Sequence, residues 1–481
     1  MDTKELTQSH ILKSAYSISK EMGIPIFLVG GTIRNLLLSS GFEKDFDFAM
    51  KGDVQSTARG FADKVKGSFF SLDPQRGHYR VTVKKNSRFI DIDFSRFRGH
   101  DIGKDLIKRD FTINSMAINI QDLFEKDEIE IIDPLNGLDD MEKGAIRACS
   151  SRVFDDDPLR LLRAVRISAV TNFTIEDKTE RLIRQKKELL INSSWERIRD
   201  ELFLMLDAPY ASRSIEKLNS LGLLSIILPE TNPWKGINQG EHHDYNLFDH
   251  TVKAIEFTEV ILANFSEYFP DYASVLKVHF DEELEKNIYR SNLIKFIAFL
   301  HDSGKVETKS YDGEKVRFLG HDRVGEEINK NIAKRLKLGH KVRRVITNIT
   351  GNHMRVLNLS KSTNISQRAK SRFFRDMGKD GIDCLLLSLA DGLATRTNAD
   401  KTQTVPLLAI IQDFLRYYFE DWLKTPEKPL LNGKEIMEML GILEGKKVGR
   451  LLSMIREAEI EGLISTKEEA KDLLKSLNPV K

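Results

Sequence analysis

The pattern of hydrophobic and polar positions changes along the chain. Short apolar or alternating runs, typical of strands, occupy residues 24–29, 45–50, 78–83 and 89–94. From about residue 154 onward, apolar positions recur at helical spacing nearly to the end. We therefore expect an α+β protein in which a small mixed-sheet head is followed by a long, all-helical body.

Composition narrows the possibilities. The 481 residues exceed one comfortable core, and 41% hydrophobic with 30% charged residues is typical of a globular protein. A net charge of +2 means that any surface for nucleic acid must come from local clusters. No window approaches the ~18 apolar residues of a spanning helix, so we expect no membrane association. With only Cys149 and Cys384, far apart, a reducing cytoplasm is favoured.

A glycine pair follows the first predicted strand. Gly30 and Gly31 precede a helix expected from about residue 32, where free amides at the helix start favour a phosphate. Arg34, one turn into this helix, could add a guanidinium to a triphosphate. Ordinary strand–helix turns carry glycine pairs too, so the meaning of this pair depends on its neighbours.

Two Asp-X-Asp pairs stand on nearby predicted strands. Alternate residues of a strand point the same way, so Asp45 and Asp47 share one face, as do Asp91 and Asp93. Two divalent ions about 3.5–4 Å apart need such oxygens to activate a hydroxyl and to neutralise a leaving pyrophosphate. Hard oxygen ligands and substrate phosphates suit Mg²⁺ best. The head is therefore predicted to bind Mg²⁺ for phosphoryl transfer.

Several stretches within residues 24–206 carry a family resemblance. They are residues 27–35 with 45–48, then 108–117, 132–140, 154–160 and 195–202. In this order they resemble the bacterial-type (class II) tRNA CCA-adding enzymes and poly(A) polymerases. The resemblance implies a polymerase β-like nucleotidyltransferase head and template-independent extension of an RNA 3′ end.

The resemblance also implies roles for single residues. Asp45 and Asp47 would be the metal-binding carboxylates, and Asp93 the third catalytic one, with Asp91 as the alternate. The residues implied to bind the nucleotide are Gly30, Gly31, Arg34, Arg109, Asp110, Asn114, Asp157, Arg160, Arg163 and Arg166. Asn35 stands where the family usually has Asp, which leaves the role of that position open.

Asp157 and Arg160 are the candidates for choosing the incoming base. A helix is expected to begin with Asp157 at its N-cap and to carry Arg160 and Arg163. CTP and ATP present an amino donor beside a ring-nitrogen acceptor, which a carboxylate and a guanidinium can satisfy together. UTP and GTP would leave Asp157 facing a carbonyl, at a cost of about 1–3 kcal/mol. The family gives this role to its Asp-X-X-Arg pair.

A short connection bears on which nucleotide is added. Only residues 99–104 separate Arg98 from Asp105, where CCA-adding and A-adding members of the family usually carry a longer flexible segment. In the family that segment is associated with the switch from C to A, and its shortening marks CC-adding members. The sequence thus favours C addition, and it leaves CC, CCA and A addition unresolved.

The middle of the chain holds a second constellation. The residues that follow the H…HD…D order of HD-domain phosphohydrolases are His250, His301, Asp302 and Asp391. Such a set can hold a divalent metal, of unknown identity here, and activate water against a phosphoester. His321 and His353 could complete a second metal shell. Whether this site is catalytically active stays open at this point.

The remaining expectations concern organisation and partners. Lys446, Lys447 and Arg450 are expected to contact RNA phosphates near the C-terminus. The expected segments are a head over 1–145, a helical neck for nucleotide and RNA over 146–235, an HD domain over 236–400, and a tRNA-binding tail over 401–481.

The expected function is nucleotidyl transfer from CTP and ATP to tRNA, with no obligate protein partner evident. One alternative is a poly(A) polymerase, which shares every head motif. Another, of a different class, is an HD phosphohydrolase whose head only binds nucleotides or RNA.

Overall fold

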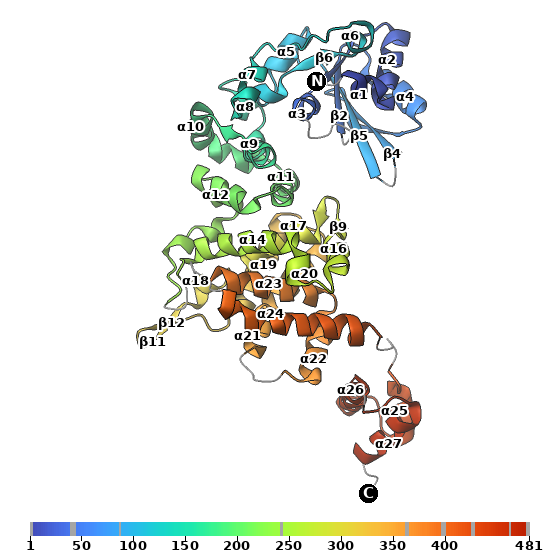
Figure 1. Ribbon diagram of the computed structural model, residues 1–481, viewed down its shortest axis with the longest axis vertical. Coiled ribbons are helices and arrows are strands. Elements are labelled where there is room, and N and C mark those ends of the chain that lie inside the picture. The colour runs from blue at the N-terminus through green and yellow to red at the C-terminus, as the bar shows by residue number, and fades with distance from the viewer. Residues whose placement is uncertain are drawn as a thin grey trace. The chain divides into compact units, whose positions relative to one another are not determined.

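The computed structural model describes residues 3–38, 45–85, 88–240, 244–360, 365–395, 401–424, 429–460 and 463–477 (Figure 1). The chain forms two compact units. Unit 1 contains residues 1–201 and 217–226, and unit 2 contains residues 202–216 and 227–481. Within the described ranges, no helix combines the length and the apolar character that a bilayer crossing requires.

A six-stranded mixed sheet forms the head of unit 1. The strands, in chain order, are β1 (Ile26–Val29), β2 (Asp45–Met50), β3 (Ser68–Asp73), β4 (His78–Lys85), β5 (Arg88–Arg96) and β6 (Ala117–Asn119). In space the order is β3-β4-β5-β2-β1-β6. The β2–β5 pair is parallel, whereas the other neighbours in this sheet are antiparallel. The strands expected from the sequence are all present.

Helices cover one face of this sheet because each strand alternates its side chains. Phe48, Ile92 and Phe94 are fully buried on that face, packed with residues of α2 (His10–Met22) and α4 (Val54–Val65). Figure 1 shows these two helices beside the strands of the head. The carboxylates of β2 and β5 alternate with these apolar positions and therefore lie on the opposite face.

Short elements complete the head, and further helices follow, the last three of which are divided between the two units. The remaining elements of the head are α1 (Thr3–Gln8), α3 (Gly31–Leu37), α5 (Ile102–Ile107), the 3₁₀ turn Thr112–Asn114, α6 (Ile120–Glu125), α7 (Gly137–Glu142) and β7 (Ala145–Ile146). After them come α8 (Val153–Asp156), α9 (Arg160–Thr171), β8 (Thr174–Ile175), α10 (Asp177–Lys186), the 3₁₀ helix Lys187–Asn192, α11 (Trp195–Asp207), α12 (Ala211–Leu221) and α13 (Leu224–Ile227). β7 and β8 pair in parallel.

The start of α9 corrects one expectation from the sequence. Asp157 is not its N-cap: the residue is extended (φ −153°), and the helix begins at Arg160 with Leu159 in the cap position. The Asp157 side chain instead accepts a hydrogen bond from the Leu159 amide at 3.2 Å. Asp157 therefore precedes the helix that carries Arg160 and Arg163. Leu159, Leu162 and Val165 are buried and form the apolar stripe of this segment.

Unit 2 is largely helical. Its first part contains the 3₁₀ turns Pro229–Thr231 and Trp234–Gly236, α14 (Leu247–Ala263), α15 (Phe265–Tyr268), α16 (Ala273–Phe280), β9 (Glu283–Glu285), β10 (Ile288–Tyr289), α17 (Arg290–Leu300), α18 (Lys305–Thr308), β11 (Ser310–Asp312), β12 (Lys315–Arg317) and α19 (His321–Arg335). It continues with α20 (His340–Asn352), α21 (Met354–Leu359), α22 (Gln367–Met377), α23 (Asp380–Ala394), α24 (Lys401–Arg416), the π-helical turn Tyr417–Asp421 and the 3₁₀ turn Trp422–Lys424. α14 packs on α17 and α23, and α19 packs on α20.

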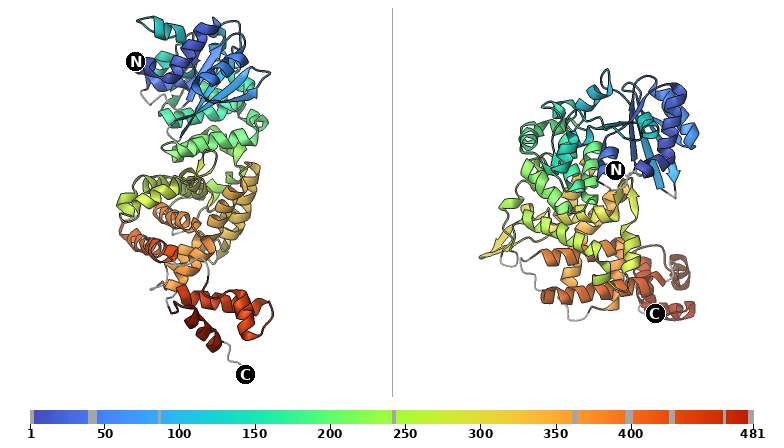
Figure 2. Two further views of the ribbon diagram at one scale, coloured as in Figure 1. Left: turned by 90° about the vertical axis from the view of Figure 1, so that its right-hand side faces the viewer. Right: turned by 45° about the horizontal axis from the view of Figure 1, so that its top comes forward.

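A small bundle ends the chain. It consists of α25 (Gly433–Leu440), α26 (Lys446–Ile460) and α27 (Lys467–Leu477), drawn in red in Figure 2. Leu431, Ile436, Ile455 and Leu474 form its core. An α+β head followed by a helical body is thus the fold of this chain, as the sequence predicts, with two short β pairs (β9–β10 and β11–β12) added in the body.

Candidate active sites

Parallel strands align the two Asp-X-Asp pairs of the head. In the β2–β5 register Asp45 lies opposite Asp91, and Asp47 lies opposite Asp93. Residues directly opposite one another across parallel strands project to the same side of a sheet. The two pairs are more than forty residues apart in the sequence. All four carboxylates nevertheless share the face of the sheet that α2 and α4 leave uncovered.

The glycine turn closes on this face. Gly30 has φ +76°, a conformation that favours glycine, and an added Cβ would lie 2.8 Å from Oδ2 of Asp47. The same Cβ would lie 3.4 Å from Nη1 of Arg109, which is itself paired with Asp105 at 2.9 Å. The backbone turn, one predicted metal carboxylate and one predicted nucleotide-binding arginine thus meet at one point.

The electrostatics of this face suit a cation. Removal from water and the neighbouring negative charge of Asp93 raise the pKa of Asp47 to about 6. A bound divalent ion would relieve both penalties, and carboxylate oxygens are ligands that Mg²⁺ prefers. The donor set therefore fits the predicted metal. In the described ranges, however, the groups of three or more ligand atoms within 4.8 Å of one another are both in unit 2.

An arginine that the sequence patterns did not single out explains this difference. Arg80 of β4 lies opposite Asp93 in the β4–β5 register. Its Nε and Nη2 donate to the two oxygens of Asp93 at 2.7 and 2.8 Å, and its Nη1 donates to Asp91 at 2.7 Å. Both β5 carboxylates are thus held toward β4. Only the register reveals this, since Arg80 stands 13 residues before Asp93 and outside every recognised stretch.

A buried polar chain contains most of the predicted nucleotide-binding residues. Arg34 donates to Asn114 at 2.8 Å and to Asn35 at 2.8 Å. Asn114 donates to Asp110 at 3.1 Å, and Arg163 donates twice to Asp110, at 2.7 and 2.9 Å. Although burial favours its neutral form, the Arg163 charge holds the pKa of Asp110 well below its usual value. Burial lowers the pKa of Arg34 to about 10.

The chain of contacts ends on α11. Arg166 donates to Glu201 at 2.6 Å, and Arg163 lies 3.7 Å from the same carboxylate. Charge-assisted bonds of this kind orient their partners, so α3, the 110–114 segment, α9 and α11 are fixed relative to one another within unit 1. Asn35, where the family usually has Asp, contributes a neutral acceptor to Arg34.

The structure does not pair the two predicted base-selecting residues directly. Asp157 accepts from Arg197 at 2.8 Å, while the buried Arg160 donates to the carbonyls of Val153 and Lys108 at 3.2 and 3.0 Å. Arg197 is therefore a further candidate, which the sequence placed in a recognised stretch without a role. Both side chains keep hydrogen-bonding capacity, because a carboxylate oxygen has a second lone pair and a guanidinium has five donors.

Residues 99–104 form a tight turn into α5. Asp101 caps the helix by accepting from the Lys104 amide at 2.8 Å. Gly99 packs against Lys104, where an added Cβ would lie 2.5 Å from the Lys104 Cβ. This segment thus folds back on itself in six residues.

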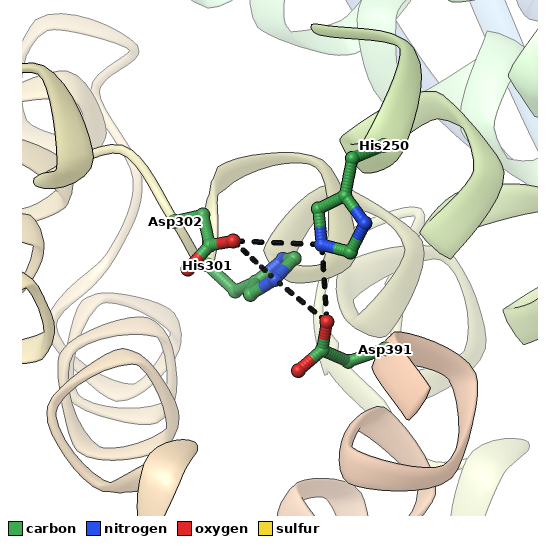
Figure 3. Close-up of side chains that lie close together, drawn as sticks. All are labelled: His250, His301, Asp302 and Asp391. Atoms are coloured by element: carbon green, nitrogen blue, oxygen red, sulfur yellow. Dashed lines mark ion pairs between the residues drawn. The ribbon is translucent and has the colours of Figure 1, made fainter. Parts of the chain in front are cut away.

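The HD residues meet in unit 2 (Figure 3). His250 comes from α14, His301 and Asp302 follow α17, and Asp391 comes from α23. Nε2 of His250 lies 3.0 Å from Asp391 and 3.5 Å from Asp302, and Nε2 of His301 lies 3.2 Å from Asp302. All four residues are buried, and their ligand atoms lie within 4.8 Å of one another. The structure thus brings together the four residues that the H…HD…D order indicates, and their binding of a metal stays a prediction.

A second group shares Asp302. His321 begins α19, His353 follows α20, and their Nε2 atoms lie 3.2 and 3.6 Å from Oδ1 of Asp302. Asp302 therefore offers one oxygen to each group. Gly304 permits this approach, since an added Cβ would lie 2.1 Å from the carbonyl oxygen of His321.

The four histidines have one orientation in common. Each places Nδ1 at a backbone carbonyl, namely that of Ala394, Ala298, Phe318 or Thr350. A carbonyl accepts the Nδ1 proton, so the Nε2 lone pairs face the centre, as in metal-bound histidines. Burial by itself lowers the pKa of His301. The combined effect of Asp302 and Asp391 is larger and raises this pKa to about 10. The centre thus stabilises positive charge, which fits a divalent metal.

Lys305 supports the same centre. Its ammonium lies 2.5 Å from Oδ2 of Asp302 and donates to Gln239 at 2.7 Å.

The predicted RNA-binding cations lie on α26. Lys446, Lys447 and Arg450 are exposed there, and the buried positions of this helix include Val448 and Leu451. These cations form an accessible positive face of that helix.

Comparisons with known proteins cover the same regions. Residues 26–147 match the poly A polymerase head domain, residues 172–235 match the probable RNA and SrmB-binding site of polymerase A, and residues 271–396 match the HD domain. A solved structure of a CCA-adding enzyme, apo form I, aligns with a TM-score of 0.64 over 99% of this chain and 94% of that chain. At 22% identity this likeness shows the fold.

Two named relatives are similar over nearly their whole length. An A-adding tRNA nucleotidyltransferase of Deinococcus radiodurans is 32% identical, over 92% of this chain and 93% of the relative. A CC-adding tRNA nucleotidyltransferase of Thermus thermophilus is 30% identical, over 93% and 92%. Together with the aligned head carboxylates and the HD centre, this extent of identity shows that the chain belongs to the bacterial-type tRNA nucleotidyltransferase family.

Proposed function

We propose that this chain adds C residues from CTP to the 3′ end of tRNA, as CC or as the first part of CCA. The observation that carries the proposal is the alignment of Asp45 and Asp47 with Asp91 and Asp93 beside the Gly30 turn. This arrangement provides carboxylates for cations and a backbone approach for phosphates at one place. CTP, ATP and tRNA are the proposed partners, and the free cysteines suit the cytoplasm.

Asp45, Asp47 and Asp93 would hold Mg²⁺ in the head. When bound, such ions help to deprotonate a 3′ hydroxyl and neutralise a leaving pyrophosphate. The Gly30 turn leaves room for the triphosphate next to Asp47, and Arg109 contributes positive charge there. Arg34, Asp110, Asn114, Arg163 and Arg166 fix the walls of the site through the buried polar chain described above.

Asp157 and Arg160 would recognise the base. Arg197 orients the Asp157 carboxylate, which can then accept from the amino group of C or A. Arg160, held by two backbone carbonyls, can donate its remaining N–H groups to the ring nitrogen.

The short 99–104 turn supports C addition. The A-adding and CC-adding relatives have similar identity, so similarity does not choose between them. The turn folds tightly onto α5 and offers no long segment that could reshape the pocket for A after C. A poly(A) polymerase remains the alternative within the same head chemistry.

A second activity is proposed for the HD centre. His250, His301, Asp302 and Asp391 would hold one divalent metal, with His321 and His353 holding a second through the shared Asp302. Such a centre supplies an activated water for hydrolysis of a phosphoester. The observation in its favour is that all four histidines present Nε2 to the carboxylates.

A contact with tRNA is proposed for α26. Its exposed cations Lys446, Lys447 and Arg450 would bind tRNA phosphates.

The product of transfer tests the main proposal. Purified protein is incubated with tRNA that ends at the discriminator base, in the presence of Mg²⁺ and labelled CTP alone, ATP alone, or both. We expect CTP alone to add two C residues. When both nucleotides are present, a product that ends in CC indicates CC addition, and one that ends in CCA indicates CCA addition. Extension with ATP alone would contradict C addition and support an A-adding or poly(A) activity.

The two centres should fail independently. Asp45→Ala is expected to lower transfer by on the order of a thousandfold, because a ligand of the transferring metals is lost, and to leave hydrolysis of bis(p-nitrophenyl) phosphate unchanged. Asp302→Asn is expected to abolish that hydrolysis and to leave transfer unchanged. Transfer that survives Asp45→Ala would contradict the head assignment, and hydrolysis that survives Asp302→Asn would contradict the HD assignment.

Removal of the Asp157 carboxylate should weaken base selection. The ratio of kcat/KM for CTP to that for UTP is expected to fall about tenfold or more in Asp157→Ala, since the acceptor that rejects a carbonyl is gone. Asp155→Ala is the matched control, because Asp155 lies two residues away and pairs with Lys186. An unchanged ratio in Asp157→Ala would overturn the role of this residue.

A further inference from the structure

The face of the head sheet that carries the carboxylates extends beyond them. On β5, Phe89 alternates with Asp91 and Asp93 and therefore points the same way. On the edge strand β3, Phe70 lies opposite Arg80, which lies opposite Asp93. One row across the sheet thus runs from Asp47 through Asp93 and Arg80 to Phe70.

Two aromatic rings on this face are left in water. The side chains of Phe70 and Phe89 are 49% and 70% exposed, whereas Phe69, which alternates with Phe70, packs on Tyr79 of the covered face. Apolar cover on the carboxylate side is found at the other end of the sheet, where Leu106 of α5 packs on Val29, Ala49 and Ala117. Large apolar side chains exposed beside a polar site commonly mark a binding surface.

The charge of this face is compatible with RNA. Four carboxylates alone would repel a phosphate backbone, but Arg80 forms ion pairs with both Asp91 and Asp93. Lys84, opposite Phe89 in the β4–β5 register, adds a further positive charge on the same side. The charges of Asp91, Asp93, Arg80 and Lys84 cancel, so the region around the two rings is close to neutral, in contrast to Asp45 and Asp47 on β2.

We propose that this open face binds the unpaired 3′-terminal nucleotides of the RNA being extended, with Phe70 and Phe89 as stacking platforms for bases. The proposal rests on the transfer function argued above, which requires a single-stranded 3′ end to reach Asp45, Asp47 and Asp93. Phe70 is two strands away from Asp93, about 10 Å, and Phe89 is four residues away, about 13 Å. Both rings are thus within reach of the last unpaired nucleotides once the 3′ hydroxyl lies at the carboxylates.

The chemistry of the platform determines what it recognises. Every base has an aromatic face, so stacking on phenylalanine binds single-stranded RNA without reading its sequence. Such a surface tolerates an end that changes from the discriminator base to C during the reaction. Discrimination between CTP and other nucleotides then stays with Asp157 and Arg160, and the platform affects only the primer.

The variants Phe70→Ala and Phe89→Ala test this division. Their KM for tRNA lacking its added nucleotides is expected to rise about tenfold or more, with KM for CTP unchanged. Val278→Ala is the control, since Val278 is 74% exposed and lies on α16, outside the head and outside the neck that is expected to bind RNA. An unchanged KM for tRNA in both phenylalanine variants would overturn the proposal.

A binding measurement separates this proposal from the transfer function. A tRNA with 2-aminopurine as its last base is titrated with the full chain in EDTA, where no transfer takes place. We expect quenching of the fluorophore by the unaltered chain and by Val278→Ala, and its loss in the two phenylalanine variants. If the unaltered chain fails to transfer nucleotides, the transfer function fails, while this quenching still decides the platform. Equal quenching in all four proteins would overturn the platform. A changed oligomeric state of the phenylalanine variants together with normal RNA binding would also overturn it, because the face would then be a contact between copies of the chain.

Discussion

The parallel pairing of β2 with β5 is the constraint on which the head depends. It aligns Asp45 and Asp47 with Asp91 and Asp93, so that carboxylates from two distant stretches face the same way. Such an arrangement is electrostatically costly, and the raised pKa of Asp47 is one expression of that cost. Arg80 reduces it by forming ion pairs with both β5 carboxylates, and Gly30 allows the backbone to approach Asp47 where any side chain would collide.

The HD centre meets a similar constraint in a different way. Here the acidic residues are neutralised by imidazoles, by Lys305 and, as we propose, by divalent metals. Asp302 is common to both groups of ligands, and the close approach of Gly304 to His321 brings the second group to it. Each centre thus depends on the close approach of one glycine, Gly30 or Gly304, and on an ion pair of its carboxylates with a basic side chain. The two centres share no residue.

Much of this could be predicted from the sequence. Strand alternation predicts that Asp45 and Asp47 share a face, and the H…HD…D order predicts the residues that meet in unit 2. The residues that were missed, and the one prediction that was wrong, depended on contacts that leave no local signal in the sequence. Arg80 is found through strand register alone, Arg197 meets Asp157 from a helix 40 residues away, and Asp157 precedes α9 because its side chain accepts the Leu159 amide in a turn. Local capping preference could not foresee that competing turn.

Metal binding tests the central claim that the chain has two separate cation centres, one in the head and one in unit 2. Binding of Mn²⁺ can be measured by electron paramagnetic resonance for the unaltered chain and for the isosteric variants Asp47→Asn and Asp302→Asn. We expect each variant to lose the sites of its own centre and to retain those of the other. If Asp47→Asn binds as much Mn²⁺ as the unaltered chain, with the same affinity, the head carboxylates do not hold a metal and the chain lacks a cation centre in the head.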